Sequence, residues 1–332
     1  MAWSVPRAPR QDGGLRVKWR SKHSTLFDWP WKLTKSDLPK NLALLLLFSF
    51  LIGGNYSLVK IAQETIPPIT LTMTRGLLAS LFLLYVVGVV MRRDLAPLIE
   101  RAGSLVLLGA LLSFFFVSLA YAEHRISPSL SSLLSCVIPV SAFLVSTLVL
   151  RRESFSFFRL SGLFVALFGV AMFVGLEAFR IDELHVLAIT VLSAGYVGYA
   201  IQIIYAEAKE LDPFVAATGT MVYLFFIAAV LAFAIERPLD VQPNRASVIA
   251  IFISGIFCTG LAYLVLFALT QRAGAVFAST SGYLFPIFTI LVSHYLMGVR
   301  FYRMQLVGVV VTLAGAWMVN RKIGKSSGHP TT

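Results

Sequence analysis

The chain has 332 residues, of which 58% are hydrophobic and only 13% charged, with a mean hydropathy of +0.81. Soluble domains carry about a quarter charged residues, so an ordinary soluble domain is excluded. The net charge of +12 lies mostly at the chain ends and in short loops. This placement suits basic residues that orient a protein in a membrane better than a surface that binds nucleic acid. Both cysteines, Cys136 and Cys258, fall in apolar stretches, so neither a disulfide framework nor a cysteine-based zinc site is predicted.

Residues 1–40 carry nine Lys/Arg residues against three acids. They contain no apolar run long enough for the core of a signal peptide, so we expect a basic cytoplasmic tail rather than a cleaved leader. Trp29 and Trp31 lie among these cations, just before the first apolar stretch. This arrangement suits an interfacial anchor on anionic lipid, and a disordered tail is the alternative.

Apolar stretches of about twenty residues, the length that crosses a bilayer as a helix, follow one another along the chain. The predicted spans are 41–62, 69–91, 103–121, 128–150, 157–176, 184–205, 213–235, 246–268, 275–298 and 303–320. Basic residues are densest in the N-terminal tail, in the C-terminal tail 321–332 and in the loops at Arg92-Arg93 and Arg151-Arg152. We therefore expect a multi-pass protein of an inner or plasma membrane with both termini cytoplasmic.

The two halves of the apolar region, residues 41–176 and 184–320, resemble each other. Three pairs of residues share nearly one offset: Pro68 with Pro213 (145), Pro139 with Pro286 (147) and Gly162 with Gly308 (146). Because each half has five spans, an odd number, the second half enters the membrane from the opposite side. The predicted fold is an all-α integral membrane protein with ten transmembrane helices in two inverted five-helix repeats, and alternating access is the expected mechanism.

Several motifs resemble one family. The segment Gly53-Gly54-Asn55-Tyr56-Ser57-Leu58-Val59-Lys60, followed by Pro67-Pro68 and Arg75, is similar to the first-repeat signature of EamA-type members of the drug/metabolite transporter superfamily. A later serine-rich stretch resembles the end of the same repeat, together with Pro139, Leu150-Arg151-Arg152-Glu153, Gly162 and Gly169. The resemblance covers roughly residues 41–320. The chain departs from it at Gly76, where the family often has an aromatic residue, and at Val299-Arg300, where an acid is common.

The resemblance implies a ten-span carrier with a central cavity, of a kind that often moves amino acids, other metabolites or toxic compounds outward. It does not name the substrate. Within transport, the alternative is a nucleotide-sugar or phosphorylated-metabolite exchanger, which would need a richly basic cavity. The alternative from another class is a non-transporting membrane enzyme or scaffold. Partners expected are a small-molecule substrate and the lipid bilayer, and a homodimer stays open.

Three polar residues of the first two spans are the leading candidates for the substrate cavity. Arg75 is the deepest charge and either attracts an anionic group or snorkels toward a helix end. Lys60 either pairs with Glu64, four residues later, or lies near the carboxylate of a metabolite. Asn55 both donates and accepts, which suits a zwitterion, although an interhelical hydrogen bond is equally consistent with the sequence.

Further candidates come from the later spans. Ser131 and Ser135 in the fourth span are expected to meet Thr280 and Tyr283 of the ninth near the pseudo-two-fold axis. Tyr199 and Tyr263 offer aromatic faces with a hydroxyl group for cavity lining. Pro139 and Pro286 are candidate hinges, or simply kinks in structural helices. Helix packing is the role expected for four glycines: Gly162, Gly169, Gly308 and Gly315.

All sixteen acids fall in a tail, in a loop or near the end of a predicted span. The lack of an intramembrane carboxylate argues against carboxylate-based proton coupling and favours facilitated diffusion or exchange. The chain has no G-x-x-x-x-G-K-[ST] phosphate loop and no H-E-x-x-H signature, so neither an ATP-driven pump on this polypeptide nor a zinc hydrolase is predicted. We expect no catalytic residues, metal or cofactor.

Overall fold

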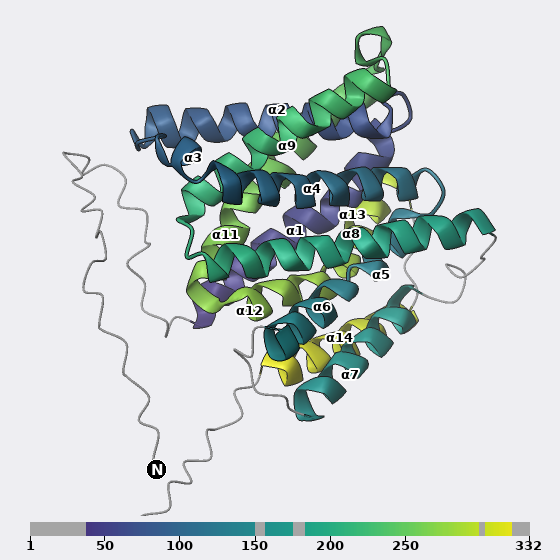
Figure 1. Cartoon of the computed structure of the whole chain (residues 1–332). Helices are drawn as coiled ribbons and strands as arrows, with labels where there is room; N and C mark the ends of the chain where they lie inside the picture. Colours follow the sequence, from purple (N-terminus) through teal and green to yellow (C-terminus); the bar gives the residue numbers. More distant parts are fainter. Residues whose placement is uncertain (1–37, 150–156, 175–182, 299–302, 321–332) are drawn as a thin grey trace, which may run out of the picture. The chain divides into compact units, whose positions relative to one another are not determined.

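The computed structural model describes residues 38–149, 157–174, 183–298 and 303–320, and within these ranges the chain is helical, with no strand. The first half comprises α1 (Leu38–Ala62), α2 (Pro68–Leu84), the short α3 (Pro97–Glu100), α4 (Ala102–Glu123), α5 (Pro128–Leu134), α6 (Val137–Leu144) and α7 (Phe157–Val174) (Figure 1). Two π-helical stretches, η1 (Tyr85–Val90) and η2 (Val145–Val149), extend α2 and α6. The predicted N-terminal tail up to residue 37, the Arg151-Arg152 loop, Val299-Arg300 and the C-terminal tail lie outside the described residues.

The second half comprises α8 (Glu183–Ala208), α9 (Pro213–Ile235), η4 (Pro238–Asp240), α10 (Arg245–Gly255), the π-helical η5 (Ile256–Leu261), α11 (Ala262–Ala273), α12 (Ala275–Ser279), the 3₁₀ turn η6 (Thr280–Tyr283), α13 (Phe285–Met297) and α14 (Arg303–Asn320). Proline occupies the first helical position of α2, α5 and α9, where its missing N–H costs no hydrogen bond.

Among the described residues, seven helical segments are long and apolar enough to cross a membrane, and an eighth is added if α12–η6 and α13 form one bent span. The seven are Leu38–Ala62, Pro68–Val90, Ala102–Glu123, Pro128–Thr147, His185–Ala208, Pro213–Ile235 and Arg245–Ala273. The predicted spans at 157–176 and 303–320 contain α7 and α14, which are apolar over the shorter stretches Leu160–Gly169 and Val307–Val319. The protein is therefore a multi-pass integral membrane protein.

Exposed and buried side chains are distributed as lipid requires. Large apolar side chains on α2 and α9 are exposed, among them Leu81 (56%), Phe226 (58%) and Val230 (71%). Polar residues such as Ser80, Thr218 and Thr220 on the same helices are instead buried. A soluble surface rarely gathers so much exposed apolar area, whereas a helix facing hydrocarbon must expose it.

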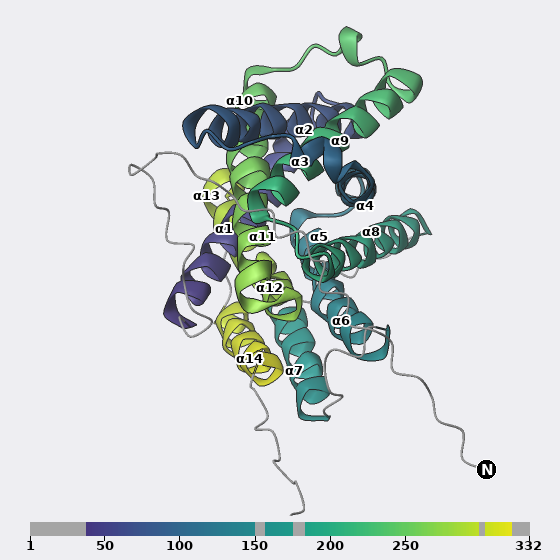
Figure 2. The ribbon, with the colours of Figure 1, turned by 60° about the vertical axis from the view of Figure 1, so that its left-hand side comes forward.

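Corresponding helices of the two halves lie side by side. α2 packs along α9 and α7 along α14, as both views show (Figures 1 and 2). The other contacts are reciprocal. α4 packs against α8 and α9 of the second half, while the continuous segment α10–η5–α11, at the matching place in the second half, packs against α1 and α2 of the first. Gly53 lets α1 approach α13 closely, because a Cβ there would lie 2.5 Å from Cβ of Phe288.

The fourth and ninth predicted spans are both broken near their middle. α5 gives way to α6 at Ser135-Cys136, and α12–η6 meets α13 at Leu284 with a bend of 40°. Pro139 lies in the first turn of α6 and Pro286 in the first turn of α13. Each proline therefore begins the second piece of a broken span, where a helix has N–H groups to spare.

Polar contacts join both ends of the antiparallel α2–α9 pair. At one end, the carboxylate of Glu236 accepts from the backbone N–H of Ile69 (3.0 Å) and Thr70 (2.7 Å) and so caps the N-terminus of α2. At the other end, Asp212 accepts from the N–H of Phe214 (2.9 Å) and Val215 (3.2 Å), capping α9. A carboxylate at a helix N-terminus satisfies free donors and complements the helix dipole.

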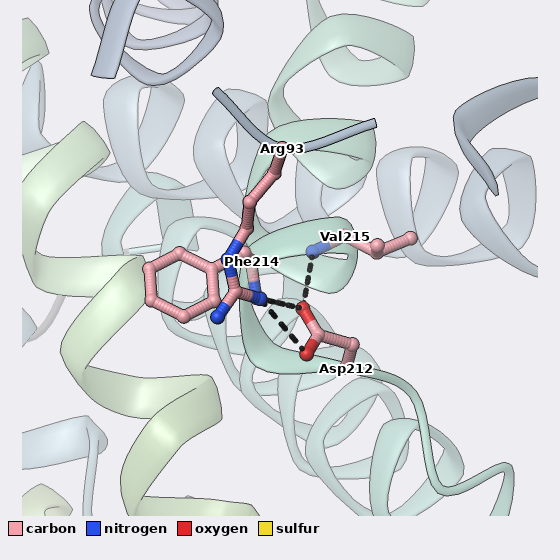
Figure 3. Close-up of polar contacts among 4 residues, drawn as sticks. All are labelled: Arg93, Asp212, Phe214 and Val215. Atoms are coloured by element: carbon pink, nitrogen blue, oxygen red, sulfur yellow. Dashed lines mark hydrogen bonds and ion pairs between the residues drawn. The ribbon is translucent and has the colours of Figure 1, made fainter. Parts of the chain in front are cut away.

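Arg93, in the loop after η1, reaches the Asp212 cap. Its Nη1 lies 3.3 Å from Oδ2 of Asp212, and its guanidinium stacks over the Phe214 ring at 4.0 Å (Figure 3). Both charged side chains are more than a third exposed, so the pair itself stabilises the fold by well under 1 kcal/mol. The cap is the larger contribution.

Substitution of Asp212 separates these two contributions. Asp212→Asn retains a capping oxygen and loses only the ion pair, so the free energy of unfolding falls by about 0.5 kcal/mol. Asp212→Ala loses the cap as well, for a total of about 1.5 kcal/mol. Thermal unfolding in detergent measures both, with Asp240→Ala at an exposed position as the control. Equal effects of Asn and Ala would show that the cap contributes nothing.

Candidate functional site

An enclosed cavity lies between helices of both halves. It is lined by Ile52, Asn55 and Tyr56 of α1, Phe115, Phe116 and Leu119 of α4, Tyr199 of α8, Tyr263 of α11 and Phe285 of α13. Six of these nine residues are aromatic. The cavity measures about 10 Å³ of space open to the centre of a water molecule, which holds at most about one water. The space is therefore too small for a metabolite, which could enter only if the surrounding helices moved apart.

The aromatic rings of the cavity pack against one another. The rings of Tyr199 and Tyr263 meet edge to face at 6.2 Å, and Phe115 tilts against Tyr199 at 5.2 Å. The hydroxyl groups of Tyr199 and Tyr263 are buried and interact with each other, although neither makes a hydrogen bond of good geometry to a described residue. Buried hydroxyls without a good hydrogen bond are costly, so a polar group of a ligand would be stabilised by them.

The ring of Phe116, which lines the cavity, separates Arg75 on α2 from it. Arg75 is 1% exposed, its Nε and Nη2 donate to Oγ1 of Thr259 at 3.3 and 3.1 Å, and its guanidinium lies 4.1 Å from the Phe116 ring centroid. Thr259 belongs to the π-helical stretch η5, a distortion that often accompanies functional positions in helices. Arg75 thus faces protein, and snorkelling to a helix end is not what the structure shows.

Asn55 and Lys60 have different surroundings. Asn55 lines the cavity, and its Oδ1 accepts from Oγ of Ser254 on α10 at 2.6 Å, which is an interhelical hydrogen bond. Contact between Asn55 and a substrate stays a prediction. Lys60 donates to the backbone carbonyl of Glu123 at the end of α4. The alternative pairing of Lys60 with Glu64 is absent from the described ion pairs, and Glu64 is exposed.

A hydrogen-bond chain next to the cavity joins three helices. Tyr196 of α8 donates its hydroxyl to the carbonyl of Ser131 on α5 at 2.8 Å. Since a phenol has one proton, the 2.7 Å contact between the hydroxyls of Tyr56 and Tyr196 must have Tyr56 as donor. The chain fixes α1, α8 and α5 relative to one another on one side of the cavity.

The predicted serine, threonine and tyrosine cluster is packed rather than open. The Oγ proton of Ser135 is shared between two carbonyls, that of Ser132 in its own span and that of Gly282 at 2.7 Å, so the fourth and ninth predicted spans do meet. Thr280 donates back to Phe277 of its own helix, and Tyr283 packs with Cys136, Leu163 and Val319. None of Ser131, Ser135, Thr280 and Tyr283 lines the cavity in this state, and their role in binding stays a prediction.

The glycines of the fifth and tenth predicted spans lie where α7 meets α14. A Cβ on Gly162 would lie 2.5 Å from Cβ of Met318, and one on Gly169 would lie 2.8 Å from the carbonyl oxygen of Gly308. A Cβ on Gly315 would lie 2.6 Å from Cα of Ala166. The two backbones approach so closely that a side chain at these positions would collide with main-chain atoms.

Glu123 is the residue that the sequence argument missed. It is the last residue of α4, near a span end as its position predicted, yet it is 0% exposed. A position near the end of a span therefore did not mean exposure to water, because protein covers the end of this helix. Cavity residues without a sequence signal were also missed, chiefly Tyr56, Phe115 and Phe116.

The sequence profile of the EamA-like transporter family matches residues 40–175 and 184–321, nearly the whole apolar region. The chain belongs to this family. EamA-like chains are named as membrane transporters, which agrees with the spans and the enclosed cavity described above.

Curated relatives of this EamA-like chain are distant. "Uncharacterized transporter in trpA 3'region" of Buchnera aphidicola subsp. Schlechtendalia chinensis is 24% identical, over 77% of this chain and 85% of its own. Protein PagO of Salmonella typhimurium is 26% identical over 77% and 84%, and an uncharacterized transporter of Archaeoglobus fulgidus is 27% identical over 84% and 97%. One solved crystal structure superposes with a TM-score of 0.69 at 16% identity, covering 84% of this chain and 95% of its own, which shows the fold alone.

Proposed function

We propose that this chain is a secondary carrier that exports small metabolites, such as amino acids with apolar side chains, by alternating access. The observation that carries the proposal is the enclosed aromatic cavity between the two halves, with Asn55 in its wall and Arg75 behind the Phe116 ring. Aromatic walls suit an apolar body, and a guanidinium with an amide suits a carboxylate.

The architecture that we propose is ten spans in two inverted five-helix repeats, 41–176 and 184–320, with both termini cytoplasmic in an inner or plasma membrane. Its support is the hydrogen bond from Ser135 to Gly282, residues 147 apart, the same offset that relates Pro139 to Pro286. A residue touches its own repeat equivalent only next to a two-fold axis. The side-by-side packing of α2 with α9 and of α7 with α14 follows the same symmetry.

The alternative, exchange of a nucleotide-sugar or phosphorylated metabolite, is less well supported. Phosphate groups need several cations, and none of the nine residues that line the cavity is basic. A membrane enzyme is disfavoured in the described part of the chain, because no group of three or more His, Cys, Asp or Glu residues there could hold a metal ion.

A ligand panel followed by a flux assay tests the function. Purified protein in detergent is heated with L-leucine, L-phenylalanine, a sugar phosphate and a nucleotide-sugar, and a ligand at 100 times its Kd raises the free energy of unfolding by about 2.7 kcal/mol. We expect stabilisation by an amino acid, and exchange of the same radiolabelled amino acid in proteoliposomes. Stabilisation and flux with the nucleotide-sugar alone would select the alternative, and flux with none would contradict amino-acid transport.

A further inference from the structure

Glu123 presents a carboxyl group in an unusual situation. It is fully buried at the end of α4, and neither Oε1 nor Oε2 has a hydrogen-bond partner among the described residues. The described ion pairs do not include it. An ionised carboxylate without hydrogen bonds or a paired cation costs several kcal/mol when it is removed from water. The negative charge of the Glu123 carboxylate must therefore be removed by something other than a hydrogen bond or an ion pair in this structure.

The two cations that act on the Glu123 carboxyl group make their hydrogen bonds to other acceptors. Lys60 on α1 donates its ammonium proton to the backbone carbonyl of Glu123 and not to its carboxylate. Arg75 on α2 directs Nε and Nη2 to Thr259. Both cations are near enough to act on the Glu123 carboxyl electrostatically without contacting it.

The remaining ionisable groups around Glu123 are few. Tyr56 of α1 and Tyr196 of α8 are engaged in their hydroxyl chain, and His124 and Arg125 follow directly in the loop. His185 lies in the first turn of α8, and Glu236 after α9 caps α2. Neither α5 nor α9 carries a charged residue within its bounds. None of these groups gives the carboxylate a counter-ion by direct contact in the described structure.

We propose that Glu123 is a proton-binding site of the transport cycle, which rests on the carrier function proposed above. With the end of α4 buried as in this structure, the carboxylate holds one proton as a neutral carboxylic acid. When the end of α4 opens to water, the proton leaves and the ammonium of Lys60 moves from the carbonyl of Glu123 to its carboxylate. Glu123 thus loses a proton and gains an ion pair with Lys60, and the contact between α1 and α4 changes as a result.

Infrared spectroscopy of the protein in lipid tests the proton without any substrate. Difference spectra between alkaline and acidic pH record the C=O stretching band of protonated carboxyl groups. We expect the wild type to keep this band at neutral pH and Glu123→Gln to lack it. The matched control Glu64→Gln, at an exposed acid in the loop between α1 and α2, should retain the band. Glu123→Asp, which keeps a carboxyl group, shifts the band and covers the case in which Glu123→Gln does not fold. Identical neutral spectra of wild type and Glu123→Gln would overturn the proposal.

Coupling is measured in proteoliposomes that contain a pH-sensitive dye. Adding the amino acid that passes the flux assay should move protons across the membrane in the wild type, and this proton movement should fall at least tenfold in Glu123→Gln. Substrate flux without proton movement in the wild type would overturn the coupling. If no amino acid is transported, the proposed function fails while the infrared result still decides whether Glu123 holds a proton.

Discussion

Replacing Arg75 with alanine lowers the rate of substrate exchange in proteoliposomes by about 100-fold, equivalent to about 2.7 kcal/mol, while the protein remains folded in the membrane. The substitution removes a fully buried cation that donates twice to Thr259 and stacks on Phe116, a ring of the cavity wall. Without it the carboxylate of a substrate loses its attraction, and the Phe116 ring loses its support.

Two companion variants separate the charge of Arg75 from its geometry. Arg75→Lys keeps a positive charge but loses the planar group that stacks on Phe116, and should recover only part of the rate. Thr259→Val removes the acceptor and leaves Arg75 in place, with an expected loss of about tenfold. Wild-type exchange by Arg75→Ala, with normal thermal unfolding, would remove Arg75 from the site.

Replacing Gly169 with valine destabilises the protein by about 3 kcal/mol and prevents much of it from folding. A Cβ there would lie 2.7 Å from Oγ1 of Thr312 and 2.8 Å from the carbonyl oxygen of Gly308, on the facing helix α14. The obstacle includes backbone, which cannot rotate out of the way, so α7 and α14 must separate. The temperature of unfolding in detergent and the yield of monodisperse protein measure the effect.

Gly103→Val is the matched control, because a Cβ at Gly103 in the first turn of α4 meets nothing within 4 Å. The same change of residue type is expected to alter the free energy of unfolding there by no more than about 0.5 kcal/mol. Equal losses at both positions would mean that Gly169→Val acts through the valine itself and not through the α7–α14 contact.

Hydrophobic length and repeat spacing were enough to predict the helical membrane fold, because lipid leaves a helix no other way to satisfy its backbone. The predicted spans at 41–62, 103–121 and 213–235 coincide with α1, α4 and α9 within a few residues. What sequence could not predict is the π-helical stretch η5 within the eighth predicted span, between α10 and α11, since such a stretch has no periodic signature.

The site was less predictable than the fold. Asn55, Tyr199 and Tyr263, predicted for a substrate cavity, line the small enclosed cavity, whereas Arg75 lies behind Phe116. That any of them contacts a substrate stays a prediction. Aromatic residues such as Phe115 and Phe116 carry no mark in a sequence where apolar residues also face lipid. The burial of Glu123 depends on neighbouring helices that cover the end of α4, and no local pattern reports what covers a helix end.

The contact between Ser135 and Gly282 limits how alike the two halves can become. The serine hydroxyl donates to the glycine carbonyl at 2.7 Å, while a Cβ on Gly282 would lie 2.6 Å from the carbonyl oxygen of Ser135. Glycine at both positions would leave no hydroxyl donor, and serine at both positions would bring a Cβ at 282 against the carbonyl oxygen of residue 135. A symmetrised chain made from two copies of residues 41–176 would therefore clash at its own centre, and the asymmetry of this one pair is a condition for the halves to close on each other.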